Sequence, residues 1–232
     1  MHKLFNTVDY TVPQLVLFGI AAAYWVWVYI AVIRDIVKNK FVGIPVLAVC
    51  SNISWEFLWS FFFYTNMGAF FEWGYRAWFV LDVFIFYSVI RYGKMQFSDP
   101  ALKKYFGWIV GFTTASWIAA IFTFTKNYSD PIGAISAYLV NAHMSALYIL
   151  LILKFPKQKT LSLSTAWHKM LGTALTSVFC FWAFPNATFM LTMTVITFIL
   201  DMTYIFIVRY YRKPMAIQEE IKIKASPVVI AE

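Results

Sequence analysis

Three acidic residues lie in long apolar stretches of the chain, where carboxyl groups are rare. Glu56, Asp82 and Asp201 each fall near the middle of such a stretch, whereas the remaining acidic residues lie in loops, tails or segment ends. A charged side chain at mid-depth in a bilayer costs at least about 2.5–3.5 kcal/mol on insertion scales. We therefore expect the three carboxyl groups to face the interior of a helix bundle and to take part in chemistry or transport.

The surroundings of Glu56 are the most informative. Asn52 precedes it by one helical turn and Ser60 follows it by one turn, so the three side chains share one helix face. The amide of Asn52 can hydrogen-bond the carboxyl group and hold its orientation. Trp55 and Trp59 flank this face. Glu56 is thus a candidate general acid, with Asn52, Trp55 and Trp59 as supporting residues.

The other two acids also lie among aromatic residues. Asp82 is close to Trp78 in the sequence, and Asp201 is close to Tyr204. On another apolar segment, two polar residues at 3–4 spacing are candidates for substrate binding or for hydrogen bonds between helices: Tyr138 and Asn141. A purely structural role, in which a buried carboxyl group only links helices, is the alternative reading for each acid.

The composition excludes a soluble domain. Hydrophobic residues make up 61% of the 232 residues and charged residues 13%, against about 45–50% and about 25% in soluble proteins. Seven segments are long and apolar enough to cross a bilayer as helices. They are residues 13–33, 44–64, 73–90, 105–124, 132–153, 165–184 and 187–208. The sequence therefore predicts an all-α polytopic membrane protein with a seven-transmembrane-helix bundle.

The basic residues predict the orientation of this bundle. All but three of the 19 Lys and Arg residues fall on one side of the predicted membrane. The three exceptions are Lys3, Arg76 and Lys126. Because basic loops stay cytoplasmic, we expect the N-terminus outside and the C-terminus in the cytoplasm. Residues 1–210 form the predicted transmembrane domain and 211–232 a short cytoplasmic tail. The net charge of +8 then reflects topology, and no nucleic-acid partner is expected.

Several kinds of chemistry are excluded by what the segments lack. Lys169 is placed at the start of the sixth segment, so no lysine is expected inside the bundle to form a retinal Schiff base. No Asp-rich cluster could hold magnesium against a diphosphate. No Ser/His/Asp or Cys/His set suggests acyl transfer. We expect neither a metal nor a cofactor.

The remaining possibility is a dry cavity with aromatic walls and two or three carboxyl groups. A carboxyl group in a low-dielectric site can hold a proton at neutral pH and act as a general acid. Aromatic faces can stabilise a carbocation. This combination is suited to cyclising a lipophilic polyene. Four tryptophans near segment ends are instead assigned to a belt at the membrane interface: Trp25, Trp27, Trp73 and Trp167.

Several short motifs carry a family resemblance. They are Gly-Ile-Pro at 43–45, Asn-Ile-Ser-Trp-Glu at 52–56, Arg-Ala-Trp at 76–78, Leu-Asp at 81–82 and Tyr-Gly at 92–93. The chain resembles the small integral-membrane terpene cyclases of fungal meroterpenoid and indole-diterpene pathways, over roughly residues 15–210. The resemblance implies seven helices and a cyclisation begun by protonating an epoxide or alkene of a prenyl chain. It also implies that Glu56 and Asp201 are the functional acids, with Asp82 in support.

The expected function is therefore that of a membrane-embedded terpene cyclase. Its substrate would be a lipophilic prenylated aromatic or linear terpenoid, and a prenyltransferase and an epoxidase would be its pathway partners. We expect it in the bacterial inner membrane or, in a eukaryote, the endoplasmic reticulum, surrounded by membrane lipid. The alternative is a small proton-coupled transporter or lipophile-binding protein that uses the same carboxyl groups. An isomerase that moves a double bond would also use them.

Overall fold

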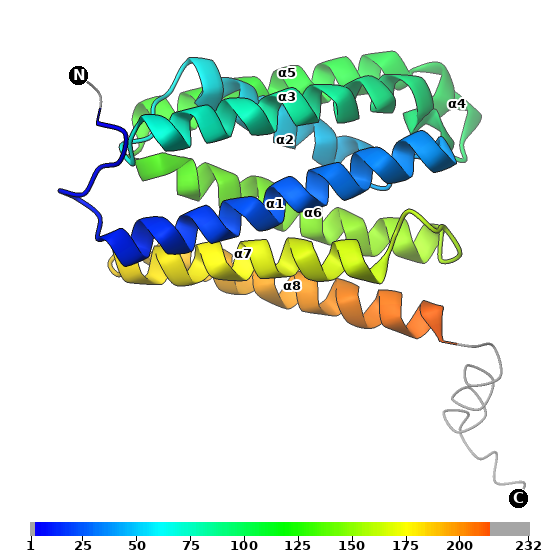
Figure 1. Cartoon of the computed structure of the whole chain (residues 1–232). Helices are drawn as coiled ribbons and strands as arrows, with labels where there is room; N and C mark the ends of the chain where they lie inside the picture. The colour runs from blue at the N-terminus through cyan, green and yellow to red at the C-terminus, as the bar shows by residue number, and fades with distance from the viewer. Residues whose placement is uncertain (1–2, 214–232) are drawn as a thin grey trace, which may run out of the picture.

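The computed structural model describes residues 3–213, and all regular secondary structure in that range is helical (Figure 1). The long helices are α1 (Val12–Asn39), α2 (Val46–Phe61), α3 (Ala69–Tyr92), α5 (Phe106–Asn127), α6 (Ala134–Lys154), α7 (Leu163–Ala183) and α8 (Thr188–Arg212). The short ones are η1 (Gly93–Gln96), α4 (Pro100–Lys104) and η2 (Pro131–Gly133).

Polar residues at helix starts explain several of these boundaries. Thr11 precedes α1, and its side chain accepts a hydrogen bond from the backbone of Gln14, whose own side chain accepts one from the backbone of Thr11. Ser162 caps α7 and Asp99 caps α4 through their side-chain oxygens. Such caps satisfy backbone N–H groups that have no partner within the helix.

The turn before α6 has an unusual backbone. Ile132 and Gly133 have φ angles of 54° and 74°, in the left-handed region. Asp130 accepts hydrogen bonds from the backbone of Ile135 and Ser136, and burial raises the pKa of its carboxyl group. The hydroxyl of Tyr75 donates to the carbonyl of Ile132 at 2.9 Å. The turn is thus held by contacts with both α6 and α3.

Helix α2 occupies the inside of the bundle. It packs against α3, α5 and α6, while α1 packs on α7 and α3, and α8 packs on α6 and α7 (Figure 1). Most side chains of α2 are buried. The helix that carries Asn52 and Glu56 is therefore enclosed by its neighbours.

The seven predicted segments are all helices in the structure, which confirms the all-α prediction. Within the described residues, five helical stretches are long and apolar enough to cross a membrane, and these contain α1, α3, α5, α6 and α8. Helix α2 has 16 residues, and α7 has the length but not the apolarity. The count of seven spans and the orientation of the termini stay predictions.

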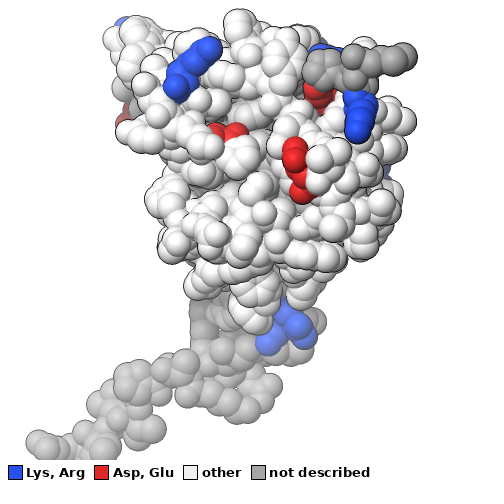
Figure 2. All heavy atoms as spheres, turned by 90° about the vertical axis from the view of Figure 1, so that its left-hand side faces the viewer, with Lys and Arg blue, Asp and Glu red and all other residues white. Residues whose placement is uncertain are grey.

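The outer surface of the bundle is apolar. Large hydrophobic side chains are exposed along the helices, among them Val16, Ile30, Val80, Leu150 and Phe206. Figure 2, which looks onto the left-hand end of Figure 1, shows charged side chains only as isolated spots on an uncharged surface. Exposed apolar surface on this scale marks a surface that contacts a membrane or another protein, and the apolar composition of the chain favours the membrane.

One basic residue is not where the charge pattern placed it. Helices α1, α3, α6 and α8 all end at the same end of the bundle (Figure 1), so the basic loops that follow them gather there, as predicted. Lys169, however, is buried within α7, so its assignment to that charged end is wrong. Helix α8 extends to Arg212, and residues 214–232 of the predicted tail lie outside the described residues.

Candidate active site

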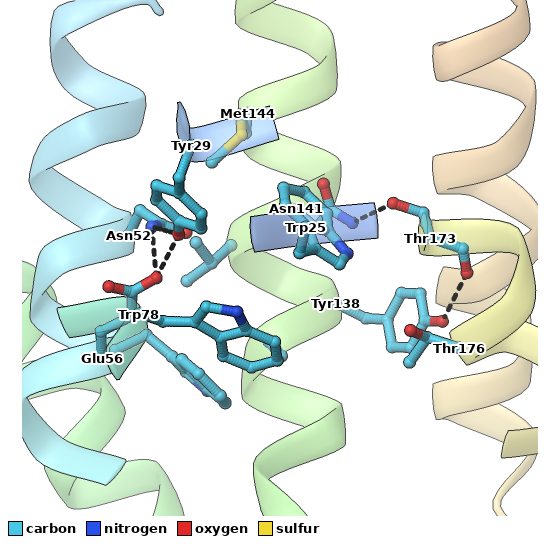
Figure 3. A pocket seen from close by; sticks show the side chains of 13 residues that line it. Trp25, Tyr29, Asn52, Glu56, Trp78, Tyr138, Asn141, Met144, Thr173 and Thr176 are labelled. Carbon is cyan, nitrogen blue, oxygen red and sulfur yellow. Dashed lines mark hydrogen bonds between the residues drawn. The ribbon is translucent and has the colours of Figure 1, made fainter. Parts of the chain in front are cut away.

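A cavity of about 100 Å³ lies between the helices, with lining residues from α1, α2, α3, α6 and α7 (Figure 3). Six of the predicted site residues line it: Asn52, Trp55, Glu56, Trp78, Tyr138 and Asn141. The structure therefore brings together most of the candidates, although they come from three different helices.

Glu56 lies on one side of the cavity, and its two carboxyl oxygens differ in their hydrogen bonding. Oε1 accepts hydrogen bonds from the hydroxyl of Tyr29 and, at 3.0 Å, from the amide of Asn52 (Figure 3). Oε2 has no hydrogen-bond partner among the described residues, and the side chain is buried. Because Oε1 already accepts two hydrogen bonds, the proton of the neutral acid belongs on Oε2, where no group of the described chain competes for it.

Asn52 connects Glu56 to a second carboxyl group. Its Nδ2 atom lies 3.2 Å from Oδ2 of Asp82, which is also buried. Asp82 does not line the main cavity but lines a smaller one that shares Tyr29 and Asn52 with it. Asp82 is therefore connected to the main cavity through Asn52 and does not line it directly.

Aromatic rings form a wall beside Glu56. The centroids of Trp55 and Tyr75 are 5.3 Å apart, and Tyr75 stacks on Trp78 at 5.4 Å with an interplanar angle of 16°. Trp59 stacks on Trp55 from behind and does not line the cavity. The indole N–H of Trp55 donates to Oγ of Ser136 at 2.9 Å. The same N–H group also donates to the carbonyl of Gly133. These two hydrogen bonds and the two ring stacks fix the orientation of this wall.

The opposite side of the cavity is polar (Figure 3). The hydroxyls of Tyr138 and Ser177 lie 2.8 Å apart, and the amide of Asn141 donates to Oγ1 of Thr173 at 3.0 Å. These contacts join α6 to α7, so the predicted role in linking helices is confirmed. Both Tyr138 and Asn141 also line the cavity.

Asp201 and Tyr204 lie apart from this cavity. Neither lines it, and Glu56 is the one acidic residue among its lining residues, whereas two or three carboxyl groups were expected around one cavity. Oδ1 of Asp201 instead lies 2.7 Å from Nζ of Lys169 and accepts a hydrogen bond from Ser145 at 2.7 Å. Tyr204 packs against Tyr148, with ring centroids 5.0 Å apart. The physical reason is the buried lysine, which binds the carboxylate of Asp201.

Three residues near the site were not predicted as site residues. Tyr29 binds Glu56, and their contact depends on how α1 packs, which spacing along α2 does not report. Trp25 lines the cavity rather than marking the membrane interface. Its ring packs on Gly172, where a Cβ atom would lie 3.0 Å from Cδ1 of Trp25. Lys169 was placed at a helix end, so the exclusion of a lysine from the bundle interior was wrong.

Comparison with known families identifies the class of this protein. The sequence model of the family described as Pyr4-like transmembrane terpene cyclases matches residues 5–214. The chain belongs to this family. Together with its apolar helices, this membership makes it an integral membrane protein.

Individual relatives are fungal proteins of moderate similarity. The Pyr4-family terpene cyclase mfmH of Annulohypoxylon moriforme is 29% identical over 107 residues, which are 46% of this chain and 43% of that protein. Terpene cyclase pyr4 of Aspergillus fumigatus is 26% identical over 100 residues, 41% of this chain and 39% of the relative. Terpene cyclase macJ of Penicillium terrestre is 23% identical over 169 residues, which are 71% of this chain and 65% of that protein.

The match therefore spans less than half the length of mfmH and of pyr4. No solved structure matches the chain.

Proposed function

We propose that this protein is a terpene cyclase that protonates an epoxide or alkene of a prenyl chain and closes rings through carbocations. The observation that carries the proposal is the state of Glu56, whose Oε2 atom has no hydrogen-bond partner within residues 3–213 and which lines a cavity walled by Trp55 and Trp78. A proton donor beside aromatic faces supplies both the start of the reaction and the stabilisation of the cations it creates.

The reaction begins with proton transfer from Oε2 of Glu56 to the epoxide oxygen. The C–O bond opens, which leaves a hydroxyl group and a carbocation. The nearest double bond supplies two electrons to form a ring C–C bond and passes the positive charge along the chain. The last cation loses a proton to a base, for which the Glu56 carboxylate left by the first step is the candidate, and gives an alkene. The acid is then restored, and substrate and product have the same composition. With an alkene as the starting group, the proton adds to carbon instead.

The size of the cavity limits what it holds. An engineered cavity of about 150 Å³ takes up benzene, so the observed volume of about 100 Å³ accommodates roughly the reacting end of a prenyl chain. The rest of a prenylated aromatic or linear terpenoid then lies outside this cavity, toward the lipid. A prenyltransferase and an epoxidase are the enzymes that would make such a substrate, in the bacterial inner membrane or the endoplasmic reticulum.

Membranes that contain the protein test this proposal directly. With a prenylated epoxide or a linear polyprenyl aromatic, they should form a cyclic product of unchanged mass, and membranes from cells without the protein should not. Product structure by NMR separates ring closure from a shifted double bond. Proton-dependent uptake into vesicles, without any chemical change in the solute, would support a transporter instead and refute the cyclase.

Replacing Gly172 by Ala should disturb the cavity without unfolding the protein. The new Cβ atom would lie 3.0 Å from Cδ1 of Trp25, so the ring must move by a few tenths of an ångström. We expect kcat/KM for cyclisation to fall about tenfold, since a methyl group in an apolar pocket discriminates on this scale. The thermal midpoint should not fall, because alanine favours a helix over glycine.

Gly111→Ala is the matched control, since nothing lies within 4 Å of its new Cβ atom. Equal kcat/KM values for the two variants would show that Trp25 does not shape the substrate site.

A further inference from the structure

Lys169 is the one basic side chain buried among the described helices. Its Nζ atom lies 2.7 Å from Oδ1 of Asp201 and 2.8 Å from Oγ of Ser145. It also lies 5.7 Å from the ring centroid of Trp25, which lines the main cavity. An ammonium group with these neighbours is well placed to stay charged, because a carboxylate, a hydroxyl and an aromatic face all surround it.

The buried charges of the bundle must nearly balance. Apart from Asp130 in a loop, the buried acidic and basic residues of the described chain are Glu56, Asp82, Asp201 and Lys169. A charge buried without a partner is far more costly than a direct ion pair. One cation can neutralise one carboxylate, and the direct contact assigns that carboxylate to Asp201.

The remaining two carboxyl groups then carry protons in the resting protein. Glu56 and Asp82 have no buried cation in contact; both accept hydrogen bonds from the neutral amide of Asn52. Oε2 of Glu56 is unpartnered among residues 3–213 and can hold the acidic proton. Oδ2 of Asp201 is likewise unpartnered among the described residues, so the difference between the two acids is the ammonium group of Lys169 on Oδ1. While that ammonium is charged it favours the carboxylate, and Asp201 has no proton to give.

We propose that Lys169 is a positioning residue that keeps Asp201 as a carboxylate, so that Glu56 alone donates the initiating proton. The inference rests on the proposed cyclase function and divides the roles of two acids that sequence analysis treated alike. Through the ammonium of Lys169, which lies over the ring of Trp25, the ion pair of Asp201 and Lys169 contributes to the field around the cavity. Asp201 does not start the reaction.

Other titratable groups lie close to the ion pair and enter its pH dependence. They are Tyr138 and Tyr148 on α6, Tyr204 on α8, Tyr29 on α1 and Asp82 on α3. The tyrosines are neutral near pH 7. Glu56 and Asp82 are the other buried carboxyl groups of the described helices, so the experiments below compare variants at Asp201 itself.

Infrared spectroscopy of the purified protein tests the assignment without any substrate. Asp201→Asn should remove a carboxylate band, and Glu56→Gln should remove a band of a protonated carboxyl group. In Lys169→Met the carboxylate band of Asp201 should be replaced by a protonated one, and this band should vanish in Lys169→Met/Asp201→Asn. Lys169→Arg, which keeps the charge, should retain the carboxylate.

Cyclisation rates give the second readout. At neutral pH, Lys169→Met should lower kcat about 10–100-fold, the scale seen when a partner that orients a functional group is removed. The loss should shrink as the pH rises, because a higher pH favours the carboxylate form of a carboxyl group that has lost its cation. Lys169→Arg should restore most of the rate. A merely structural lysine would change the amount of folded protein but not the pH profile of what remains.

Two outcomes would overturn the inference. One is the loss of a protonated carboxyl band in Asp201→Asn, and the other is a pH profile in Lys169→Met that parallels the unmodified protein. If Lys169→Met does not fold, the spectra of Asp201→Asn and Glu56→Gln still decide the protonation states. If the unmodified protein forms no cyclic product, the proposed function fails while the spectra still test the ion pair.

Discussion

Glu56→Gln should lower the rate of cyclisation by about 10²–10⁴-fold, which is the usual contribution of a general acid. Glutamine keeps a carbonyl oxygen that can accept the hydrogen bonds from Tyr29 and Asn52. It has no acidic proton on the other side. The fold and the cavity should therefore persist while proton transfer to the substrate stops. Product formation per mole of folded protein, measured in membranes, is the quantity to compare.

Glu72→Gln makes the same chemical change in the first turn of α3, away from the cavity, and should leave the rate unchanged. A Glu56→Gln variant that is folded and cyclises at the rate of the Glu72→Gln control would remove Glu56 from the mechanism. In that case the free carboxyl oxygen would be a structural feature only.

Gly133→Ala should destabilise the protein by about 2–5 kcal/mol. A left-handed backbone costs a non-glycine residue about 1–2 kcal/mol, and Gly133 has a φ angle of 74°. The new Cβ atom would also lie 2.5 Å from Cε2 of Trp59 and 2.9 Å from Cζ2 of Trp55. Overpacking of this kind costs about 1–3 kcal/mol more. Chemical unfolding in detergent measures the difference.

Gly74→Ala is the matched control for this experiment. Nothing lies within 4 Å of its new Cβ atom, and it is within α3, where alanine should stabilise the helix slightly. If Gly133→Ala unfolded at the same denaturant concentration as Gly74→Ala, the turn before α6 would have to be more adaptable than its contacts with Trp55 and Trp59 indicate.

Sequence reasoning succeeded where a feature lies within one helix. Long apolar runs predicted all seven long helices, and one-turn spacing placed Asn52 against Glu56. The short elements η1, α4 and η2 were not predicted, since they are too brief to leave a periodic pattern. Their positions depend on local turns rather than on burial of an apolar face.

Contacts between distant helices explain the errors. Lys169 and Asp201 are on different helices, and a single sequence contains no distance between them. Without knowledge of that pairing, a lysine in an apolar segment is interpreted as the start of a helix, and the carboxyl group of Asp201 is interpreted as a second functional acid. Trp25 was misread for the same reason, because its place in the cavity depends on the space that Gly172 leaves on α7.

The ion pair between α7 and α8 also bears on how the chain enters the bilayer. A lone lysine or aspartate at the centre of a helix costs about 2.5–3.5 kcal/mol during insertion, and α7 is less apolar than a typical spanning helix. The turn between α7 and α8 is short, so the two charges can meet before either helix is exposed to lipid alone. If both helices cross the bilayer, biogenesis should therefore favour entry of α7 and α8 together as a helical hairpin, after which the earlier helices close around it.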